Sequence, residues 1–463
     1  FIASANVDRM QTESRERLDS FLPCLLEAVV TTEQPSLALE RTLPLVESVL
    51  RRTAYLSLLI ENPAALQRLV TLCAASPWIA KELATHPVLL DEFLNADTLY
   101  HPADKSELQS ELYQHLLRVQ EDDLEAQMNT LRYFKLSHNL RVAAAEINGT
   151  LPLMKVSDYL SNIAEVVCSA VLDLAWRQMA QKYGEPAVAE TGSRPFVIVA
   201  YGKLGGIELS YGSDLDLVFL HDALPGGNTD GAKAVDNGMF MVRLGQRMIH
   251  ILTTRTHLGQ LYEADMRLRP NGESGLLACS FSAFEKYQQE TAWVWEHQAL
   301  VRARVIAGDQ NLAEKVENCR AEVLKKHRET EALRAEVVSM REKMRDHLRP
   351  KDTETENHPE FDLKHGSGAI VDIEFMVQYA VLIWSREHPS LSRYTDNIRL
   401  LESLREVGVL SEPESVGLID AYKAFRSHGH RLALQQQKAR LPLSELQLER
   451  QHVQAMWAKL MQV

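Results

Sequence analysis

Residues 211–222 read Tyr211-Gly212-Ser213-Asp214-Leu215-Asp216-Leu217-Val218-Phe219-Leu220-His221-Asp222 and carry the strongest signal in this 463-residue chain. Asp214 and Asp216 are separated by one leucine and are followed by an apolar run, 217–220. In an extended strand, side chains two positions apart point to the same face, so both carboxylates converge at the start of a buried strand. Like charges there are costly unless a cation compensates them. Paired aspartates with few other protein ligands suit Mg²⁺ that bridges substrate phosphates, which indicates nucleotidyl-transfer chemistry.

A second segment, 261–269, supplies a third carboxylate. Its acidic and basic residues alternate with apolar ones, so in a strand they would share one face: Glu263, Asp265, Arg267 and Arg269. A solvated edge strand shows the same alternation, but the apolar opposite face here indicates packing on the sheet that carries the aspartate pair. We expect Asp265 to be the third metal ligand, with Glu263 as the reserve. A two-metal site of this kind would use the arginines to contact a polyphosphate.

A glycine-rich loop, 202–206, follows a short apolar run, 196–201, that we predict to be a buried strand. Glycine lets backbone amides approach a phosphate closely, and Lys203 would add a positive charge. A glycine after a strand more often simply makes a turn, and the spacing matches neither the P-loop nor the dinucleotide-binding fingerprint. The residues that we expect to contact the nucleotide are Gly202, Lys203, Gly205, Gly206, Gly212, Ser213, Arg267 and Arg269.

The order of periodic patterns divides the chain into three regions. Residues 1–155 show helical periodicity without strand signals, and the helical pattern returns over 311–463. Between them, 156–310 combines strand and helix patterns. We therefore predict an α+β fold, predominantly helical, in which a nucleotidyltransferase domain with a small mixed sheet lies between an N-terminal helical region and a C-terminal helical bundle. In the middle region the patterns predict helices at 157–183 and 236–256, and further strands at 261–269 and 302–306.

Bulk composition restricts the class of partner and the compartment. The net charge of −13 argues against a nucleic acid as the main partner. The five cysteines form no Cys-x-x-Cys pair, which favours reduced thiols in the cytoplasm and offers no zinc site. We predict no membrane span, because the most apolar candidate, 369–384, contains two acidic residues and a glutamine. Since the chain begins with Phe1, we expect it to be a piece of a longer protein.

Three other clusters suggest chemistry less strongly. The histidines of 428–430 lack partners at metal-ligand spacing, and we expect them on a helix surface. The aromatic group of Trp293, Trp295 and His297 fits core and interface positions better than a platform for base stacking. Asp372 and Glu374 follow a glycine-containing loop and either support the site from the C-terminal region or cap a helix; the sequence leaves both alternatives open.

Three motifs together resemble one protein family. They are Gly202-Lys203-Leu204-Gly205-Gly206-Ile207-Glu208-Leu209, Gly212-Ser213-Asp214-Leu215-Asp216-Leu217 and Tyr262-Glu263-Ala264-Asp265-Met266-Arg267-Leu268-Arg269-Pro270. The family is the bifunctional glutamine synthetase adenylyltransferase/adenylyl-removing enzyme of bacterial nitrogen control. Segments 296–304 and 364–375 extend the resemblance over nearly the whole chain. It implies a DNA-polymerase-β-like fold, with one nucleotidyltransferase unit in each half of the polypeptide.

The Gly-Ser-Asp-Leu-Asp form of the central motif resembles the C-terminal, adenylylating half of that family. The resemblance implies transfer of AMP from ATP to a tyrosine hydroxyl of glutamine synthetase, which regulates nitrogen assimilation. Asp214 and Asp216 would bridge two Mg²⁺ ions, and Asp265 would hold the metal on the nucleophile side. Implied partners are glutamine synthetase, the other half of the polypeptide and, as effectors, a PII signalling protein and glutamine. Two alternatives stay open: phosphorolytic removal of AMP from adenylylated glutamine synthetase, and a regulatory helical module that binds PII or glutamine.

Overall fold

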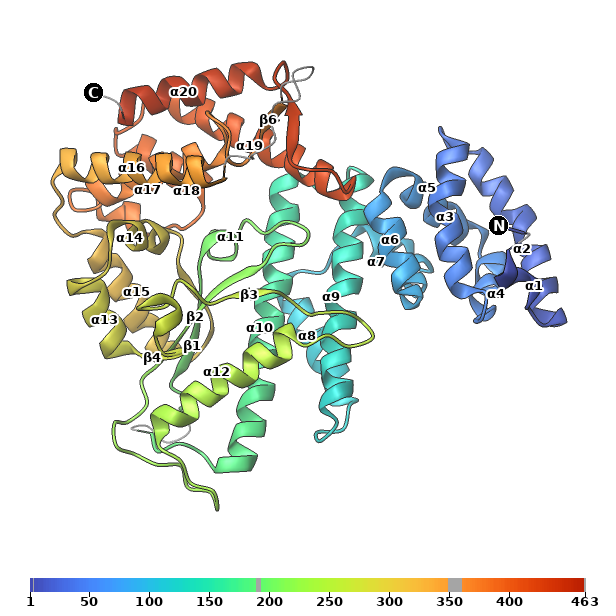
Figure 1. The fold of residues 1–463 in the computed structure, drawn as a ribbon, viewed down its shortest axis with the longest axis horizontal. Coiled ribbons are helices and arrows are strands. Elements are labelled where there is room, and N and C mark those ends of the chain that lie inside the picture. The colour runs from blue at the N-terminus through green and yellow to red at the C-terminus, as the bar shows by residue number, and fades with distance from the viewer. Residues whose placement is uncertain (3, 189–192, 349–359, 462–463) are drawn as a thin grey trace.

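The computed structural model describes residues 1–2, 4–188, 193–348 and 360–461. Figure 1 shows a central sheet, a C-terminal group of helices above it, and an arm of N-terminal helices that projects to one side. The predicted predominantly helical α+β fold with a small mixed sheet is confirmed. The division at residues 155 and 310 stays a prediction.

The N-terminal region is built from helices that range from 4 residues (α1) to 24 residues (α9). Several of them begin with a proline, whose fixed φ suits the first helical turn. Ser76 caps one of these helices, since its hydroxyl oxygen accepts a hydrogen bond from the amide of Ile79 at 3.2 Å. The elements are α1 (Ala5–Asp8), α2 (Thr12–Val30), α3 (Pro35–Val49), α4 (Ala54–Glu61), α5 (Pro63–Ala75), α6 (Pro77–Thr85), η1 (Pro87–Phe93), α7 (Ala96–Tyr100), α8 (Lys105–Leu117) and α9 (Leu124–Ile147).

The long helix α10 (Leu153–Tyr183) connects this region to the sheet. It ends at Gly184, whose φ of 83° favours glycine. Among the described residues it is the one helix that is long and apolar enough to cross a membrane, but 72% of its most apolar window is buried inside the fold. Packing against α9 and α12 (Asn237–Thr253) explains its composition.

The sheet is mixed and places two parallel strands beside β2 (Leu215–His221). β1 (Phe196–Ala200) runs antiparallel to both β2 and β5 (Arg304–Gly308), whereas β3 (Ala264–Asp265) and β4 (Ala278–Ser280) run parallel to β2. Side chains of β1 and β2 alternate between two cores, one shared with α10 and α12 and one with α13 (Phe281–Glu290) and α15 (Gln310–Leu324). Both faces of the central strands are therefore covered.

One predicted strand is much shorter than expected. The sequence pattern predicted a strand over 261–269, but β3 contains only Ala264 and Asp265. The chain then turns, and the guanidinium of Arg269 donates hydrogen bonds to the carbonyl oxygens of Met266 (2.7 Å), Glu273 (3.0 Å) and Gly275 (3.2 Å). This loop includes η2 (Gly272–Ser274) and holds Arg269 away from the strand-like position predicted for it.

The C-terminal region packs around α17 (Ile370–Trp384). It also reaches back across the molecule, because Ser76 donates a hydrogen bond to the carbonyl oxygen of Leu434 at 2.8 Å. The remaining elements are α14 (Val294–Val301), α16 (Thr330–Leu348), β6 (Glu360–Asp362), η3 (Pro389–Ser392), α18 (Asn397–Glu406), α19 (Glu412–Leu434), β7 (Arg440–Pro442) and α20 (Gln447–Met461).

Candidate active site

The predicted carboxylates gather where β2 and β3 begin. In the parallel register of these strands, Asp216 lies opposite Asp265, and Asp214 directly precedes β2. The amide of Leu215 donates to the carbonyl oxygen of Glu263 at 2.9 Å and fixes this register. The ends of the strands border an open depression of about 680 Å³. It is lined by Asp214, Glu263, Ala264, Asp265, Met266, Arg267, Arg269 and Glu273.

Negative charge at this point of the sheet is only partly compensated. Burial, followed by the charges of Asp214 and Asp265, raises the pKa of Asp216 to about 6. Lys364 and Arg302 oppose this rise but do not cancel it. A carboxyl group with such neighbours binds a proton readily, and it would bind a cation for the same reason. The electrostatics therefore favour a positively charged ligand beside Asp216.

Asp265 is engaged by an arginine in this structure. Arg267 Nε lies 2.8 Å from Asp265 Oδ2, and the Arg267 amide donates to Oδ1 at 2.8 Å. These hydrogen bonds lower the pKa of Asp265. In the part of the chain that the structure describes, no group of three His, Cys, Asp or Glu side chains is arranged to hold a metal ion. The oxygen donors suit a hard cation such as Mg²⁺ in chemistry, but Asp265 must leave Arg267 before it can act as a ligand.

Glycine at position 202 makes room for the Asp216 carboxylate. Gly202 begins the short helix α11 (Gly202–Gly205) with a φ of +56°, and a Cβ atom built there would lie 2.2 Å from Asp216 Oδ2. A methyl group at that distance would have to displace the carboxylate. The closeness of α11 to β2 is therefore part of how the aspartate is positioned.

We expect Gly202→Ala to lower activity far more than its effect on stability suggests. The added methyl group must push Asp216 aside, and a positive φ costs an alanine about 1 kcal/mol. Gly149→Ala is the matched control, since Gly149 also has a positive φ (+74°) but nothing within 4 Å of a built Cβ. Melting temperature and transfer rate of both variants should separate the two effects. Equal activity in both would contradict the role assigned to Gly202.

The next two glycines have a packing role that the sequence did not reveal. A Cβ on Gly205 would lie 1.9 Å from the carbonyl oxygen of Arg302, and one on Gly206 would lie 2.5 Å from Arg302 Nη2. The amide of Gly205 donates to Tyr201 at 2.9 Å, and that of Gly206 donates to Gly202 at 3.0 Å. Both amides are thus already used inside the protein. The structure offers neither of them free for the phosphate contact that we predicted.

Lys203 and Ser213 flank the aspartates differently. Burial, and then the positive charges of Lys364 and Arg426, lowers the pKa of Lys203, while Asp214 is among the groups that oppose the shift. Ser213 stabilises a turn, because its hydroxyl oxygen accepts the amide of Ser210 at 3.2 Å. Gly212, in the same turn, has a φ of 72°. Their nucleotide contacts stay predictions.

A buried ion-pair network beside the site was missed at the sequence level. Arg302 bridges the carboxylates of Glu208 and Glu374 and is 4% exposed. Glu208, which is 2% exposed, also accepts hydrogen bonds from the Tyr422 hydroxyl (2.5 Å) and the Asn397 amide (3.1 Å). The network joins α11, the start of β5 and the C-terminal helices. Glu208 was visible in the glycine-rich motif, but no local pattern identified its partners.

The structure assigns separate roles to the two acidic residues at the start of α17. Asp372 is buried and accepts hydrogen bonds from Arg341 Nε (2.7 Å) and the Gly368 amide (2.7 Å). It therefore stabilises the beginning of the helix. Glu374 instead pairs with Arg302 and so supports the site from the C-terminal region. The sequence left open whether these residues cap a helix or support the site. Asp372 stabilises the start of the helix, and Glu374 supports the site.

The two weaker clusters have different outcomes. The aromatic group was expected at core and interface positions: His297 is buried, whereas Trp293 (69% exposed) and Trp295 (38% exposed) lie at the surface, and an interface position for them stays a prediction. His430, expected on a helix surface, is buried, and its ring lies 5.8 Å from that of Tyr211. The face of α19 that carries it packs against α10 and α6.

Comparisons with known proteins show the family to which the chain is similar. A family model described as glutamate-ammonia ligase adenylyltransferase matches residues 66–319, and one described as GlnD PII-uridylyltransferase matches residues 338–459. Similar proteins are named bifunctional glutamine synthetase adenylyltransferase/adenylyl-removing enzyme. Those of Pseudomonas syringae pv. tomato and Pseudomonas aeruginosa are both 55% identical, over 99% and 98% of this chain and 47% of each relative. The relative from Hahella chejuensis is 52% identical over 98% of this chain and 48% of its own length. The chain thus spans about half the length of the curated relatives it matches.

Proposed function

Because this chain belongs to the glutamate-ammonia ligase adenylyltransferase family, we propose that it transfers AMP from ATP to a tyrosine hydroxyl of glutamine synthetase and releases pyrophosphate. The observation that carries the proposal is the set of three carboxylates at the start of β2 and β3, with the pKa of Asp216 raised to about 6. Three acidic side chains concentrated beside a solvent-open depression fit phosphoryl chemistry with a cationic partner. The central motif supports the adenylylating half of the bifunctional relatives.

Asp214, Asp216 and Asp265 are the residues that would hold two Mg²⁺ ions. Bound there, the metal would lower the pKa of the attacking hydroxyl and neutralise charge on the pyrophosphate leaving group. A tyrosine hydroxyl has an ordinary pKa of about 10 and needs such help near neutral pH. Asp265 borders the depression and is placed to accept the proton.

Arg267 would pair with Asp265 only until the nucleotide binds. Its side chain is 72% exposed, so the guanidinium can leave the carboxylate without unpacking the fold. We propose that it turns to the triphosphate when the nucleotide arrives, because a guanidinium pairs with phosphate oxygens as it does with carboxylate oxygens. Asp265 is then free to act as a ligand and a base.

A regulatory contribution of the C-terminal region is a second proposal. The match of residues 338–459 to a PII-uridylyltransferase family supports a contact with a PII signalling protein or a response to glutamine. The buried Arg302–Glu374 ion pair gives such a contact a physical connection to the carboxylate site.

A cytoplasmic location is supported by the five cysteines, all of which are free thiols.

The test uses this chain, ATP labelled at the α-phosphate, magnesium chloride and unmodified glutamine synthetase. We expect label on the synthetase, and its loss when Asp214 is replaced by asparagine. Asp309→Asn is the matched control, because Asp309 caps α15 and asparagine can accept the same hydrogen bond from the amide of Leu312. Release of AMP from modified synthetase on addition of phosphate, without forward labelling, would instead establish the reverse reaction.

A further inference from the structure

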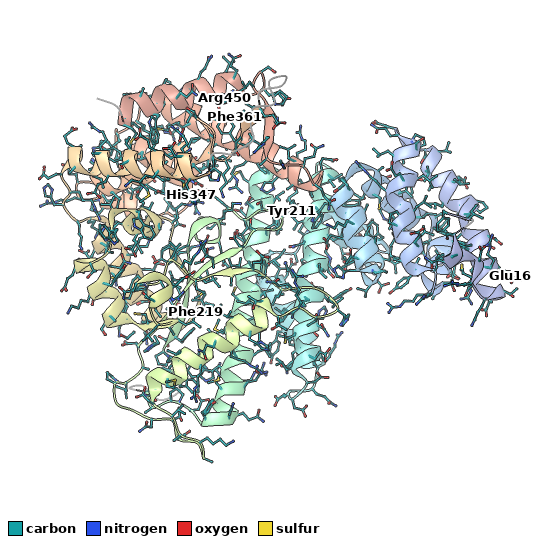
Figure 2. All side chains as sticks on the ribbon, viewed as in Figure 1. Glu16, Tyr211, Phe219, His347, Phe361 and Arg450 are labelled. Carbon is teal, nitrogen blue, oxygen red and sulfur yellow. The ribbon has the colours of Figure 1, made fainter. Side chains whose placement is uncertain are left out.

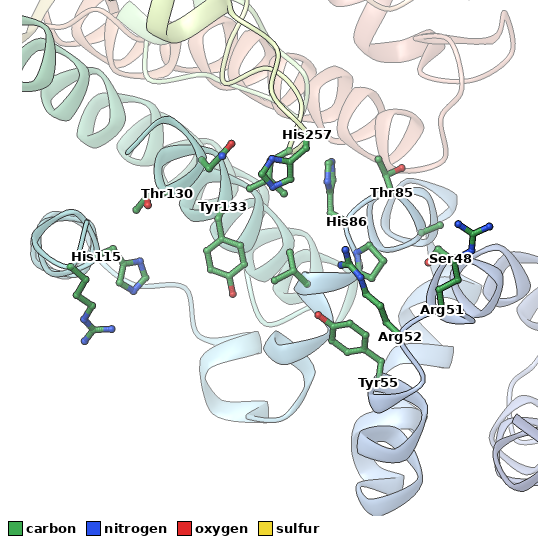
Figure 3. A pocket seen from close by; sticks show the side chains of 16 residues that line it. Ser48, Arg51, Arg52, Tyr55, Thr85, His86, His115, Thr130, Tyr133 and His257 are labelled. Carbon is green, nitrogen blue, oxygen red and sulfur yellow. The ribbon is translucent and has the colours of Figure 1, made fainter. Parts of the chain in front are cut away.

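A second pocket lies between the N-terminal helices and the loop that joins α12 to β3. It has a volume of about 900 Å³ and is lined by sixteen residues (Figure 3). All sixteen belong to the described residues, and none of them is Asp or Glu, although the whole chain has 63 acidic against 50 basic residues. The basic members are Arg51, Arg52, Arg118, His86, His115 and His257. The pocket therefore concentrates positive charge in an acidic protein.

The central basic residues come from different elements and face one another. Figure 3 shows Arg52 extending toward His86, which lies beside His257, and the hydroxyl group of Tyr55 on the side that faces Tyr133. The Tyr133 hydroxyl itself donates to Glu92 Oε1 at 3.4 Å. The guanidinium of Arg52 has no hydrogen-bond or ion-pair partner in the described part of the chain. Burial and then the positive charge of His257 lower the pKa of His86, which favours its neutral form. The arginines therefore supply the positive charge of the pocket, and no carboxylate among the lining residues compensates them.

Surface arginines are common, and exposure alone would not distinguish this pocket. One feature does. His86 is 8% exposed and lines the pocket, so one of these side chains is built into the wall instead of lying free in solvent.

We propose that this pocket binds a small molecule that carries a phosphate or carboxylate group. A concave site lined by one sign of charge attracts the opposite charge, and the Arg52 guanidinium and the Tyr55 hydroxyl provide donors for the anion. Such a molecule would join the N-terminal helices to the nucleotidyltransferase region through His257.

The pocket is connected to the carboxylate site by the α12–β3 loop, residues 254–263. The loop is held by α9, because Arg132 Nε donates to the carbonyl oxygen of Gly259 at 2.8 Å and Lys135 Nζ to that of Leu261 at 2.5 Å. It leads directly into β3, which carries Asp265. A ligand held by Arg52 and His257 would therefore restrict the segment that places the third carboxylate.

Thermal unfolding of the whole chain tests the proposal in magnesium-free chloride buffer at matched ionic strength. Inorganic phosphate and succinate are the two probes, one for each class of anion. We expect at least one of them to raise the melting temperature, since a ligand of the folded state stabilises it. Arg52→Gln should raise the dissociation constant of that probe about tenfold or more, because a charge-assisted hydrogen bond is lost. The matched control is Arg255→Gln, in the same loop but outside the pocket lining, which should leave binding unchanged.

Hydrogen exchange then locates the bound probe. Protection should appear at residues 84–88 and 254–261 together in the wild type and be absent in Arg52→Gln. Replacing His257 by glutamine should also weaken binding of the probe, because His257 lies on the opposite wall of the pocket from Arg52. The proposal is overturned if neither probe shifts the melting temperature, or if the shift is the same in Arg52→Gln as in the wild type.

Discussion

Replacing Asp216 by asparagine is expected to lower the rate of AMP transfer about a thousandfold or more, because several kcal/mol of charge stabilisation at the reacting phosphate depend on this carboxylate. The same substitution should make the metal-free protein more stable. Asp216 lies opposite Asp265 and next to Asp214, and its charge is costly when nothing compensates it. Loss of function with a gain of stability is the pattern that a site built for a cation should show.

The sign of the stability effect follows from the pKa. Burial and the two neighbouring aspartates raise the pKa of Asp216 from 3.8 to about 6. The folded state therefore holds this proton more tightly than the unfolded chain, and the stability of the wild type falls as pH rises from about 4 to 6. Above that range the uncompensated charge costs about 2–3 kcal/mol, which asparagine removes. The melting temperatures of the two proteins should therefore differ much more at pH 8 than at pH 4.5.

Added magnesium provides the internal check on this prediction. It should stabilise the wild type at pH 8 and have little effect on Asp216→Asn, because the variant lacks a central ligand. Asp309→Asn, which keeps its helix cap, should respond to magnesium as the wild type does. A variant that loses activity and also melts earlier than the wild type in metal-free buffer would contradict the electrostatic account.

The proximity of the three aspartates could be predicted because its information is local. Asp214 and Asp216 are two positions apart at the start of β2, and Asp265 lies opposite Asp216 in one parallel strand pair. The residue at which β3 ends could not be predicted from the local sequence. The strand ends at Asp265, where the chain turns and Arg269 donates hydrogen bonds to the carbonyl oxygens of Glu273 and Gly275. The alternation of polar and apolar residues nevertheless continues beyond Asp265, and it therefore predicted a longer strand.

Other features could not be predicted because two different structures need the same residue type. Glycine is required both where a backbone approaches a phosphate and where it packs on a side chain, so Gly205 and Gly206 could not reveal their contact with Arg302. His430 was expected at the surface because the histidines of 428–430 lack partners at metal-ligand spacing. Its burial depends on the packing of α19 against α10, which no local pattern encodes.

The buried network around Arg302 leads to the second large prediction, Arg302→Met. Burial acts to lower the pKa of Arg302, but the carboxylates of Glu208 and Glu374 outweigh it and the pKa is raised, so the pairs are strongly coupled. Methionine fills a similar volume but leaves both carboxylates without their shared cation. Breaking a buried ion pair from one side costs about 3–5 kcal/mol, mainly through the charge left behind. The free energy of unfolding in urea, followed by tryptophan fluorescence, should fall by that amount.

Two further variants separate lost pairing from lost packing. Arg15→Met removes an exposed arginine whose partner, Asp19, lies one helical turn away, and should cost less than about 1 kcal/mol. Adding Glu208→Gln to Arg302→Met removes one of the stranded charges and should recover part of the lost stability, which a double-mutant cycle measures. Because Arg302 also lowers the pKa of Asp216, its loss should raise the pH at which Asp216 ionises. If Arg302→Met cost no more than Arg15→Met, the network would not be what holds the C-terminal helices against the carboxylate site.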